Sequence, residues 1–372
     1  MNGGRDASAA PEPDVDLLIV GAGFAGLAAA KTAARAGARV RVVDAKRAVG
    51  ARLHTTGIFV KEAHDLLDIP SHLIRKVERV RLYGPSRRAV DLAAPGSYFL
   101  TTDTKGVLAF MAEEAAAAGA EIRVAARFEG ARQDETGVTA RIGGESVRAR
   151  MLLGADGARS RVAQAFDLGR NTRMLTGLER EYPLPADLDP NYLYCFLDSR
   201  SAPGYLAWAA PAPGFLQVGL AVAHGRRPAL KPFSDEVEDR FGLDTSRIME
   251  RRSGVIPCGG LVKRWAEHRV LLVGDAAGMV SPLTGGGIKL AIEQGRLFAD
   301  AIARHLLADG PAPIPTLAPG LPRFGVKSAL RAGLDRAPAN PILDAALSTA
   351  AFRAFARRVY FSRGGSDAVG AM

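Results

Sequence analysis

The sequence predicts a mixed α/β (α+β) fold, and three observations lead to this class. An apolar run at Leu17–Val20 is followed by a glycine-rich turn and an Ala-rich segment, which is the pattern of a βαβ unit. Residues 171–262 are rich in aromatics and prolines, with alternating apolar residues, as is typical of an antiparallel sheet. The segment beyond residue 320 has a helical pattern. We therefore expect an interleaved Rossmann-type domain, an antiparallel β-sheet domain and a C-terminal helical region.

The N-terminal glycine turn has the spacing G-x-G-x-x-G. Gly21 permits a tight strand-to-helix turn, Gly23 lets the backbone approach a pyrophosphate, and Gly26 lets helix and strand pack closely. The following helix, Ala25–Arg35, offers free N–H groups and a partial positive charge to phosphates at its N-terminus. The second strand, Arg39–Val43, ends at Asp44, where an acid can accept hydrogen bonds from a ribose. Strand, helix, strand and acid together predict a dinucleotide site rather than an ordinary glycine-rich turn.

The loop after Asp44 carries two side chains with more than one interpretation. Arg52 is either a cap for a phosphate held by the first turn or a solvated loop arginine. His54 is either a structural histidine or a catalytic base or covalent attachment point. The sequence alone leaves both choices open.

The next segments alternate between helix and strand patterns. We expect helices at residues 58–67 and 106–118, the second capped by Asp103. Strands are expected at 77–82, 88–92, 121–124, 137–142 and 146–150, with Gly143 and Gly144 forming a hairpin turn. A further apolar strand at 151–153 leads into a glycine-rich turn that carries Asp156.

The aromatic region and the segment after it carry further ligand candidates. Tyr205 and Trp208 lie among turn residues, and they either line an apolar substrate cavity or belong to the sheet core. A strand beginning at Val270 ends at Gly274 and Asp275. Three consecutive glycines, 285–287, precede a helix over 289–307 and would let a planar ligand approach the backbone closely.

Composition and charge restrict the classes of partner and the cellular location that we expect for this chain. The chain has 372 residues, a formal net charge of +10 and scattered basic residues without a nucleic-acid-binding motif, so we expect no nucleic-acid partner. Its two cysteines form no metal-binding set and indicate a reducing compartment. We expect a cytoplasmic protein with residues 1–13 disordered and no membrane-spanning segment. The aromatic and cationic tail helix over 324–361 either rests on a membrane surface or docks on its own domain.

Three separated segments together resemble one family. Gly21–Gly26, the run Gly-Ala-Asp-Gly-Ala-Arg-Ser-Arg at 154–161 and Gly-Asp-Ala-Ala-Gly at 274–278 occur in the order found in FAD-dependent oxidoreductases with the para-hydroxybenzoate hydroxylase fold. The continuation Met-Val-Ser-Pro-Leu-Thr-Gly-Gly-Gly-Ile at 279–288 resembles the geranylgeranyl reductase branch. The run Pro-Gly-Tyr-Leu-Ala-Trp-Ala-Ala-Pro at 203–211 is similar to the aromatic substrate-domain motif of that branch.

The resemblance implies FAD as the cofactor and a set of contacts to it. Its pyrophosphate would lie on the first turn, its ribose at Asp44, its ribityl chain at Asp275 and its isoalloxazine along the triple glycine. The implied FAD-contacting residues are Gly21, Ala22, Gly23, Phe24, Ala25, Gly26, Asp44, Ala45, Arg52, Asp156, Gly274, Asp275, Gly285, Gly286, Gly287 and Ile288. His54, Tyr205 and Trp208 are the substrate-pocket candidates, and no catalytic residue is identified.

The implied domains are discontinuous. Residues 14–75, 100–165 and 265–310 would bind FAD, residues 76–99 and 166–264 would form the substrate domain, and residues 320–372 the helical region. Without a second Rossmann fingerprint, NADPH or NADH would bind only transiently as electron donor.

The resemblance implies reduction of a carbon–carbon double bond in a hydrophobic, prenyl or polyketide-like molecule, by hydride from flavin N5. Residues 53–57 read Leu-His-Thr-Thr-Gly and lack the cysteine of the Cys-Gly pair that geranylgeranyl reductases usually carry there. Two alternatives therefore stay open: an NAD(P)H-dependent monooxygenase acting on an aromatic or lipophilic substrate, and a non-catalytic flavin-binding protein. Oligomeric state is not predicted.

Overall fold

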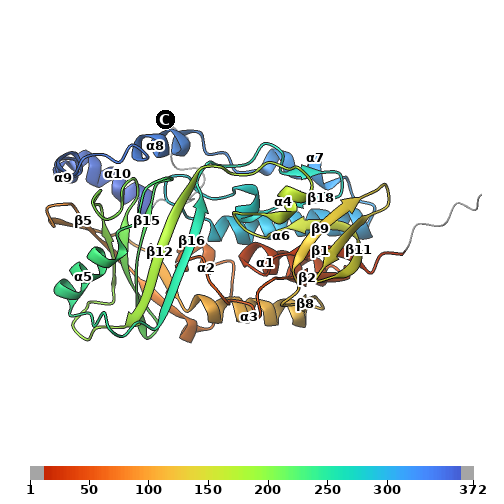
Figure 1. Cartoon of the computed structure of the whole chain (residues 1–372), viewed down its shortest axis with the longest axis horizontal. Coiled ribbons are helices and arrows are strands. Elements are labelled where there is room, and N and C mark those ends of the chain that lie inside the picture. The colour runs from red at the N-terminus through yellow and green to blue at the C-terminus, as the bar shows by residue number, and fades with distance from the viewer. Residues whose placement is uncertain (1–11, 362–372) are drawn as a thin grey trace, which may run out of the picture.

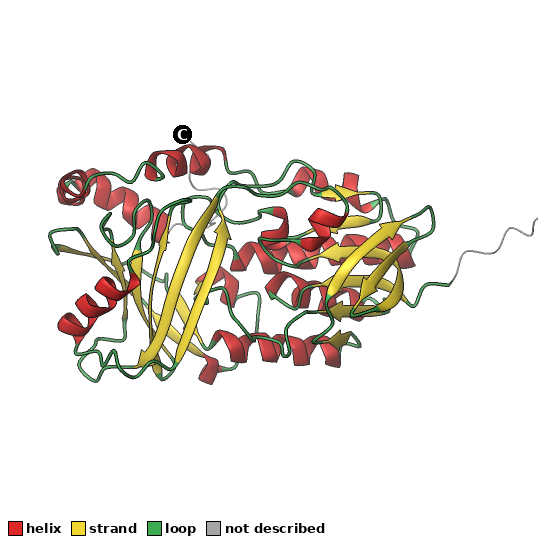
Figure 2. Ribbon diagram, viewed as in Figure 1, coloured by secondary structure: helices red, strands yellow, loops and turns green. Residues whose placement is uncertain are grey.

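Two large sheets lie side by side in the computed structural model, which describes residues 12–361 (Figures 1 and 2). This arrangement confirms the predicted α/β class, with a Rossmann-type sheet, antiparallel strands and C-terminal helices. We predicted disorder for residues 1–13, and residues 1–11 of that segment lie outside the described residues. The end of the predicted C-terminal region, 362–372, lies outside them as well.

The first sheet has eight strands and a parallel centre in the order β18-β11-β1-β2-β8, with β17 antiparallel at the β18 edge. The second half of β11 pairs with β1 and β18, and its first half forms an antiparallel hairpin with β10 through Gly143 and Gly144, as predicted. The strands are β1 Val15–Val20, β2 Val40–Val43, β8 Glu121–Arg123, β9 Phe128–Gln133, β10 Val138–Ile142, β11 Glu145–Gly154, β17 Ala266–Glu267 and β18 Val270–Leu272.

Three helices pack with this sheet: α1 Phe24–Arg35, α3 Thr104–Ala117 and α6 Ile288–Leu307. Helix α1 contacts both of the others and is rich in alanine, so its neighbours approach closely. A Cβ added at Gly295 of α6 would lie 2.4 Å from the carbonyl oxygen of Ala25. The same helix pair therefore depends on glycine at residue 295.

The second sheet has seven strands in the order β16-β12-β15-β14-β13-β5-β6. All neighbouring pairs are antiparallel except β13 with β5. Helix α5, Leu230–Phe241, packs on one face through Phe233, which lies 5.1 Å from Phe196 between ring centroids. The strands are β5 Arg79–Tyr83, β6 Ala89–Leu92, β12 Met174–Pro183, β13 Tyr192–Phe196, β14 Ala207–Ala212, β15 Phe215–Val222 and β16 Glu250–Pro257.

A third, three-stranded sheet has the order β3-β7-β4. One of its strands occupies a segment for which we expected a helix. The helix expected at 58–67 is wrong over its first part, where β3, Ile58–Val60, pairs with β7, Phe99–Thr102. β-Branched Ile58 and Val60 suit a strand once β7 supplies a partner, and only the one-turn helix α2, Lys61–His64, follows. The third strand is β4, Ile74–Val77, preceded by the 3₁₀ helix η1, Ser71–Leu73.

The C-terminal helices cover the other face of the seven-stranded sheet. Phe352, Tyr360 and Phe361 of the last helix pack in the apolar cluster of that face, so its aromatic side docks on its own domain. None of the helices in residues 12–361 combines the length and apolar character needed to cross a bilayer. The remaining short helices are α4 Arg161–Ala165, η2 Gly274–Ala277, α7 Pro313–Leu317, η3 Ala318–Gly320, α8 Gly325–Leu334, α9 Asn340–Ser348 and α10 Ala350–Phe361.

We predict that Asp103→Ala lowers the free energy of unfolding by about 1 kcal/mol. The Asp103 side chain caps α3 by accepting a hydrogen bond of 3.1 Å from the Gly106 N–H, as the sequence predicted. Urea unfolding of the purified protein measures the change, with Asp103→Asn as the control that keeps a capping oxygen. Equal losses in both variants would contradict the capping role.

Candidate functional site

The glycine turn between β1 and α1 contains one glycine that faces open space. Gly21 has φ +108°, and an added Cβ would lie 2.4 Å from the Ala155 carbonyl oxygen. A Cβ at Gly26 would lie 1.9 Å from the Gly21 carbonyl oxygen. An added Cβ at Gly23 would meet nothing within 4 Å. Gly21 and Gly26 are therefore required by packing, whereas Gly23 leaves room at the N-terminus of α1.

Two of the other residues of this turn, Phe24 and Ala25, act in packing. Phe24 is buried and lies edge-on to Phe59, with 5.4 Å between ring centroids. Ala25 is buried, and its Cβ would lie 3.0 Å from one added at Gly274. Helix α1 and the turn after β18 thus meet at Ala25.

Asp44 stands at the end of β2 and holds the neighbouring backbone. Its Oδ2 accepts a 2.9 Å hydrogen bond from the Ala22 N–H, and its Oδ1 accepts one of 2.8 Å from the Lys46 N–H. Ala45 and Arg52 are exposed, and Arg52 has φ +49°. The geometry places the Asp44 carboxylate beside the first glycine turn.

Asp156 binds the start of a helix. Its carboxylate accepts hydrogen bonds from Ser160 Oγ at 2.6 Å, the Arg161 N–H at 2.7 Å and the Val162 N–H at 3.1 Å. Burial raises the pKa of Asp156. The residue therefore fixes the turn between β11 and α4.

Asp275 differs from the other two acids. It lies in the turn η2 after β18, and among residues 12–361 no group donates a hydrogen bond to its carboxylate. Burial raises its pKa to about 6. A half-buried carboxylate without a donor from the chain fits a hydroxyl-bearing ligand.

The triple glycine leads directly into α6. Gly285 has φ +63°, Gly287 is the N-cap residue, and Ile288 is the first residue of the helix. The Gly286 N–H has only a long contact of 3.4 Å to Thr284 Oγ1. A Cβ added at Gly287 would lie 3.5 Å from Asp275 Oδ1, so the N-terminus of α6 begins beside that carboxylate. The unpaired N–H groups of a helix N-terminus suit a planar group with an anionic edge.

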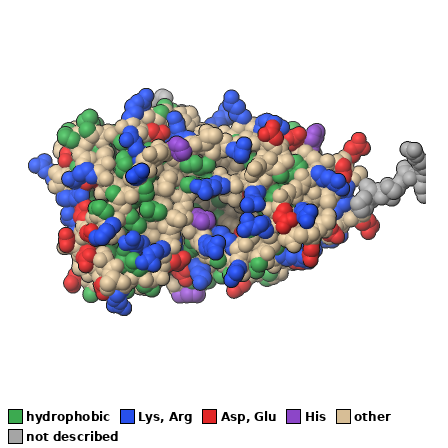
Figure 3. All heavy atoms as spheres, in the orientation of Figure 1, with side chains coloured by type: hydrophobic (Ala, Val, Ile, Leu, Met, Phe, Trp, Pro, Cys, Tyr) green, Lys and Arg blue, Asp and Glu red, His purple; other side chains and the backbone are tan. Residues whose placement is uncertain are grey.

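These features together fit FAD. Gly23 leaves an open cradle, Asp275 lacks a donor and the N-terminus of α6 lies at the triple glycine. Figure 3 shows the face of the molecule hollowed between β16 and the eight-stranded sheet, with Lys and Arg side chains around the hollow. The positive charges of these side chains would attract a diphosphate group.

The seven-stranded sheet reaches this region through Tyr205. The Tyr205 hydroxyl donates a hydrogen bond to the Thr284 carbonyl oxygen, directly before the triple glycine. A Cβ added at Gly285 would lie 2.9 Å from that hydroxyl. Tyr205 therefore joins the sheet to the loop that leads into α6.

Trp208 is held in a row across four strands. Pairing aligns Trp208 with Gly219, Gly219 with Glu179, and Glu179 with Arg252. The indole lies over Gly219, where an added Cβ would come 2.6 Å from its Cζ2 atom. Its Nε1 donates a 2.9 Å hydrogen bond to Glu179 Oε2.

A buried ionic cluster surrounds this row. The Arg252 guanidinium contacts Glu181, lies 3.4 Å from Glu179 Oε1 and lies 3.3 Å from Glu250 Oε2. Burial raises the pKa of Glu179, and it raises that of Glu181 to about 7. Three carboxylates thus share one guanidinium at this end of the sheet face.

The loop at 54–57 rests on the same end of the sheet. His54 Nδ1 lies 2.8 Å from the Ser253 carbonyl oxygen, and Gln217 Nε2 donates a 2.8 Å hydrogen bond to the Thr56 carbonyl oxygen. His54 is exposed and touches Gly254 of β16. Tyr205 therefore contacts the loop that leads into α6, whereas His54 contacts Gly254 of β16.

Sequence reasoning missed the buried charged residues Glu179, Glu181, Arg252 and Arg331. A signal was present for the first three, because they stand at inward positions of strands that alternate with apolar residues. Arg331 gave no such signal, because a helical pattern alone does not show which face a partner covers.

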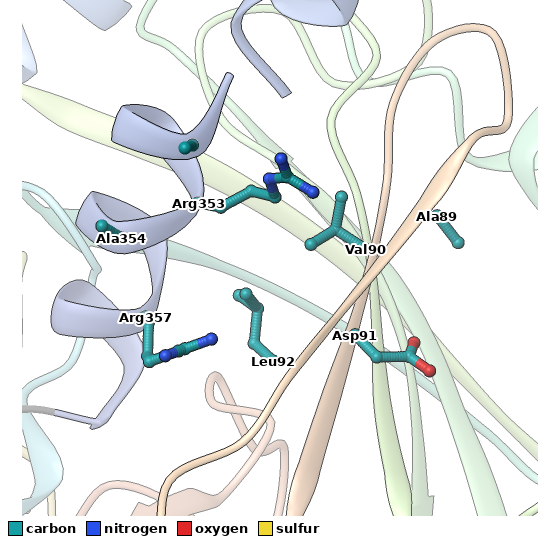
Figure 4. Close-up of a pocket in the computed structure, with 8 residues that line it drawn as sticks. Ala89, Val90, Asp91, Leu92, Arg353, Ala354 and Arg357 are labelled. Atoms are coloured by element: carbon teal, nitrogen blue, oxygen red, sulfur yellow. The ribbon is translucent and has the colours of Figure 1, made fainter. Parts of the chain in front are cut away.

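A separate groove lies between β6 and α10, with a volume of about 480 Å³. Figure 4 shows Arg353 and Arg357 extending from α10 toward Val90 and Leu92. No carboxylate among residues 12–361 forms an ion pair with either arginine. The lining residues are Ala89, Val90, Asp91, Leu92, Ala350, Arg353, Ala354 and Arg357.

Comparison with known proteins agrees with this geometry. Residues 14–187 match the FAD binding domain family, and residues 233–359 match the lycopene cyclase protein family. A digeranylgeranylglycerophospholipid reductase of Methanosarcina acetivorans is 30% identical, with 77% of this chain and 74% of the relative covered. Digeranylgeranylglycerophospholipid reductase 1 of Methanothermobacter thermautotrophicus is 31% identical, with 80% and 79% covered.

The fold has a solved counterpart as well. The crystal structure of a geranylgeranyl bacteriochlorophyll reductase-like protein from Thermoplasma acidophilum superposes with a TM-score of 0.81 at 22% identity, covering 93% of this chain and 96% of that one. At this identity the likeness establishes the fold. With the FAD-type cradle and the two relatives, the chain belongs to the geranylgeranyl reductase family of FAD-dependent oxidoreductases.

Proposed function

We propose that the protein is an FAD-dependent reductase that saturates carbon–carbon double bonds in a hydrophobic polyisoprenoid molecule. The main observation in support is the contact of Tyr205 with Thr284. It places the aromatic motif of the seven-stranded sheet beside the loop that would line the flavin. The relatives, which are named as reductases of a digeranylgeranyl lipid, support a prenyl substrate.

The cofactor would be held by the strand ends of the eight-stranded sheet. We assign the pyrophosphate to Gly21–Gly26 with Arg52, the adenosine ribose to Asp44, and the ribityl chain to Asp275. The triple glycine and Ile288 would follow the isoalloxazine. Asp156 would act indirectly, by fixing the turn that packs on Gly21.

When bound and reduced, FAD supplies a hydride for an electrophilic carbon. The chain itself supplies the surroundings of that chemistry. The N-terminus of α6 stabilises negative charge beside Gly287. Tyr205 and Trp208 form an apolar wall that keeps water from a bound alkene, and Glu179 holds the indole in place.

We also propose how electrons and substrate arrive. NADPH or NADH would bind transiently. Residues 14–75, 100–165 and 265–310 would act as the FAD-binding unit, and residues 76–99 and 166–264 as the substrate unit. Because Phe355 is 39% exposed and the neighbouring Arg358 is exposed, α10 would touch an anionic membrane surface.

The function is tested by following cofactor and product together. We expect the purified protein to carry a flavin spectrum. With dithionite or NADPH and a geranylgeranyl lipid, we expect an anaerobic product heavier by two hydrogens for each bond reduced. A product heavier by one oxygen, formed only in air, would instead identify a monooxygenase. Failure to bind added FAD would refute both assignments.

We predict opposite outcomes for two neighbouring glycines. Gly23→Ala should fold but bind FAD at least about tenfold more weakly, because its methyl group enters the open cradle. Gly26→Ala should fail to fold stably, because its methyl group would clash with the Gly21 carbonyl. Circular dichroism and FAD titration distinguish the two. An unchanged FAD affinity in Gly23→Ala would move the pyrophosphate elsewhere.

We predict that Asp275→Asn stabilises the flavin-free protein and weakens FAD binding. The pKa of Asp275 in the folded protein is about 6, which is above its ordinary value. Ionisation of Asp275 therefore lowers the free energy of unfolding, with the full effect above about pH 6 and no effect below about pH 4. The variant should gain up to about 3 kcal/mol at pH 7.5, with a smaller gain at pH 5. Urea unfolding at both pH values measures this. A gain independent of pH would contradict an ionised Asp275.

A further inference from the structure

The groove between β6 and α10 has an apolar floor and a cationic rim. Leu92 is buried and Val90 is half-buried, and both side chains point from β6 toward α10 (Figure 4). Across the groove, Arg353 and Arg357 are exposed and stand about one helical turn apart on α10. Ala354 lies between them, and its small side chain leaves room beside the strand. Apolar and cationic side chains therefore line one space.

The positive charge of the groove is not balanced within residues 12–361. Neither groove arginine forms an ion pair there, and Arg353 Nε has only a 3.4 Å contact to the Thr349 carbonyl oxygen. Asp91 lines the groove, but its carboxylate points away from α10 (Figure 4). That carboxylate accepts hydrogen bonds of 2.7 Å from Arg81 and 3.1 Å from the Tyr192 hydroxyl. Two guanidinium groups are thus available to an anionic ligand.

The groove is open and large enough for part of an amphiphilic molecule. Its volume of about 480 Å³ lies within the range of about 300–1,000 Å³ that is usual for small-molecule sites. Both arginines, Ala89 and Ala350 are exposed at its border, so a ligand can enter from solvent. None of the lining residues belongs to the set assigned to FAD or to the substrate-pocket candidates. The groove is therefore a second site, distinct from that of the flavin.

The surroundings of the groove favour a membrane lipid as the ligand. Phe355 of α10 is 39% exposed, and Ile342 of the neighbouring helix α9 is 62% exposed. Large apolar side chains exposed beside basic ones are typical of a surface that lies on a membrane. An acidic peptide would engage the arginines and leave these apolar side chains in water. A phospholipid uses both, because its phosphate suits a guanidinium and its chain suits the apolar floor.

We propose that the groove between β6 and α10 binds one anionic phospholipid molecule of a membrane surface. The phosphate would lie between Arg353 and Arg357, and the first part of one chain would lie over Val90 and Leu92. The planar guanidinium groups offer paired N–H donors to the phosphate oxygens. This adds a built lipid site to the membrane contact proposed for α10, and it does not depend on the reductase activity.

The test uses short-chain lipids below their micelle concentration, because a monomeric lipid probes the groove in the absence of a bilayer. Calorimetric titration of the purified protein, with FAD added, compares dihexanoylphosphatidylglycerol with dihexanoylphosphatidylcholine and with inorganic phosphate. We expect one phosphatidylglycerol per chain, bound at least about tenfold more tightly than either of the other probes.

Substitutions separate the role of charge from that of shape. Arg353→Gln combined with Arg357→Gln should weaken phosphatidylglycerol binding by about tenfold or more. Arg336→Gln removes an exposed arginine outside the groove lining and should leave binding unchanged. Ala354→Leu keeps both arginines but fills the groove, so it should weaken binding as well. Ala351→Leu is its matched control at an exposed position of α10 outside the lining, and it should bind like the wild type.

Absence of phosphatidylglycerol binding, or binding that neither the double arginine variant nor Ala354→Leu alters, would overturn the proposal. Equal affinity for the two lipids would remove the role of the arginines. Equal affinity for inorganic phosphate would identify a free anion as the ligand, and competition by hexaglutamate at the same concentration would indicate an acidic protein partner; each overturns the lipid assignment. Because these measurements need no turnover, failure of the proposed reductase function would leave them intact.

Discussion

The close contacts around Ala25 constrain the whole molecule. Gly26 approaches the Gly21 carbonyl, Gly295 of α6 approaches the Ala25 carbonyl, and Gly274 lies against the Ala25 methyl group. Any side chain at these glycines would push α1 away from the turn after β1, from the turn after β18 or from α6. Because these elements meet there, the ends of three strands distant in sequence face one elongated space, and a single long cofactor can span it.

The substrate half depends on a few polar contacts with that core. Tyr205 reaches Thr284, Gln217 reaches Thr56, and His54 reaches Ser253. Each contact joins the seven-stranded sheet to a loop bordering the cofactor space. Hydrogen bonds to backbone carbonyls fix position without requiring a particular partner side chain, which allows the sheet face to carry apolar and charged groups side by side.

The face itself is electrically uneven. Three carboxylates surround the Arg252 guanidinium, whereas Arg331 and Arg173 share the carboxylate of Asp335. Burying unequal charges costs free energy that an apolar core would not, so such clusters are candidates for function rather than for stability.

The sequence by itself determined the local features: the glycine turn, the Asp103 cap, the Gly143–Gly144 hairpin and the triple glycine before α6. In each, the requirement lies within a few residues, such as a positive φ or a free N–H group. The sequence also indicated the family, because its three glycine-rich motifs occur in the order that is typical of that family. Tertiary structure alone decided that residues 58–60 form a strand, since β7 supplies the partner. It likewise brought Trp208 to Glu179 and Arg331 to Tyr205, because contacts across 29 and more than 100 positions depend on strand register and helix docking that local pattern does not encode.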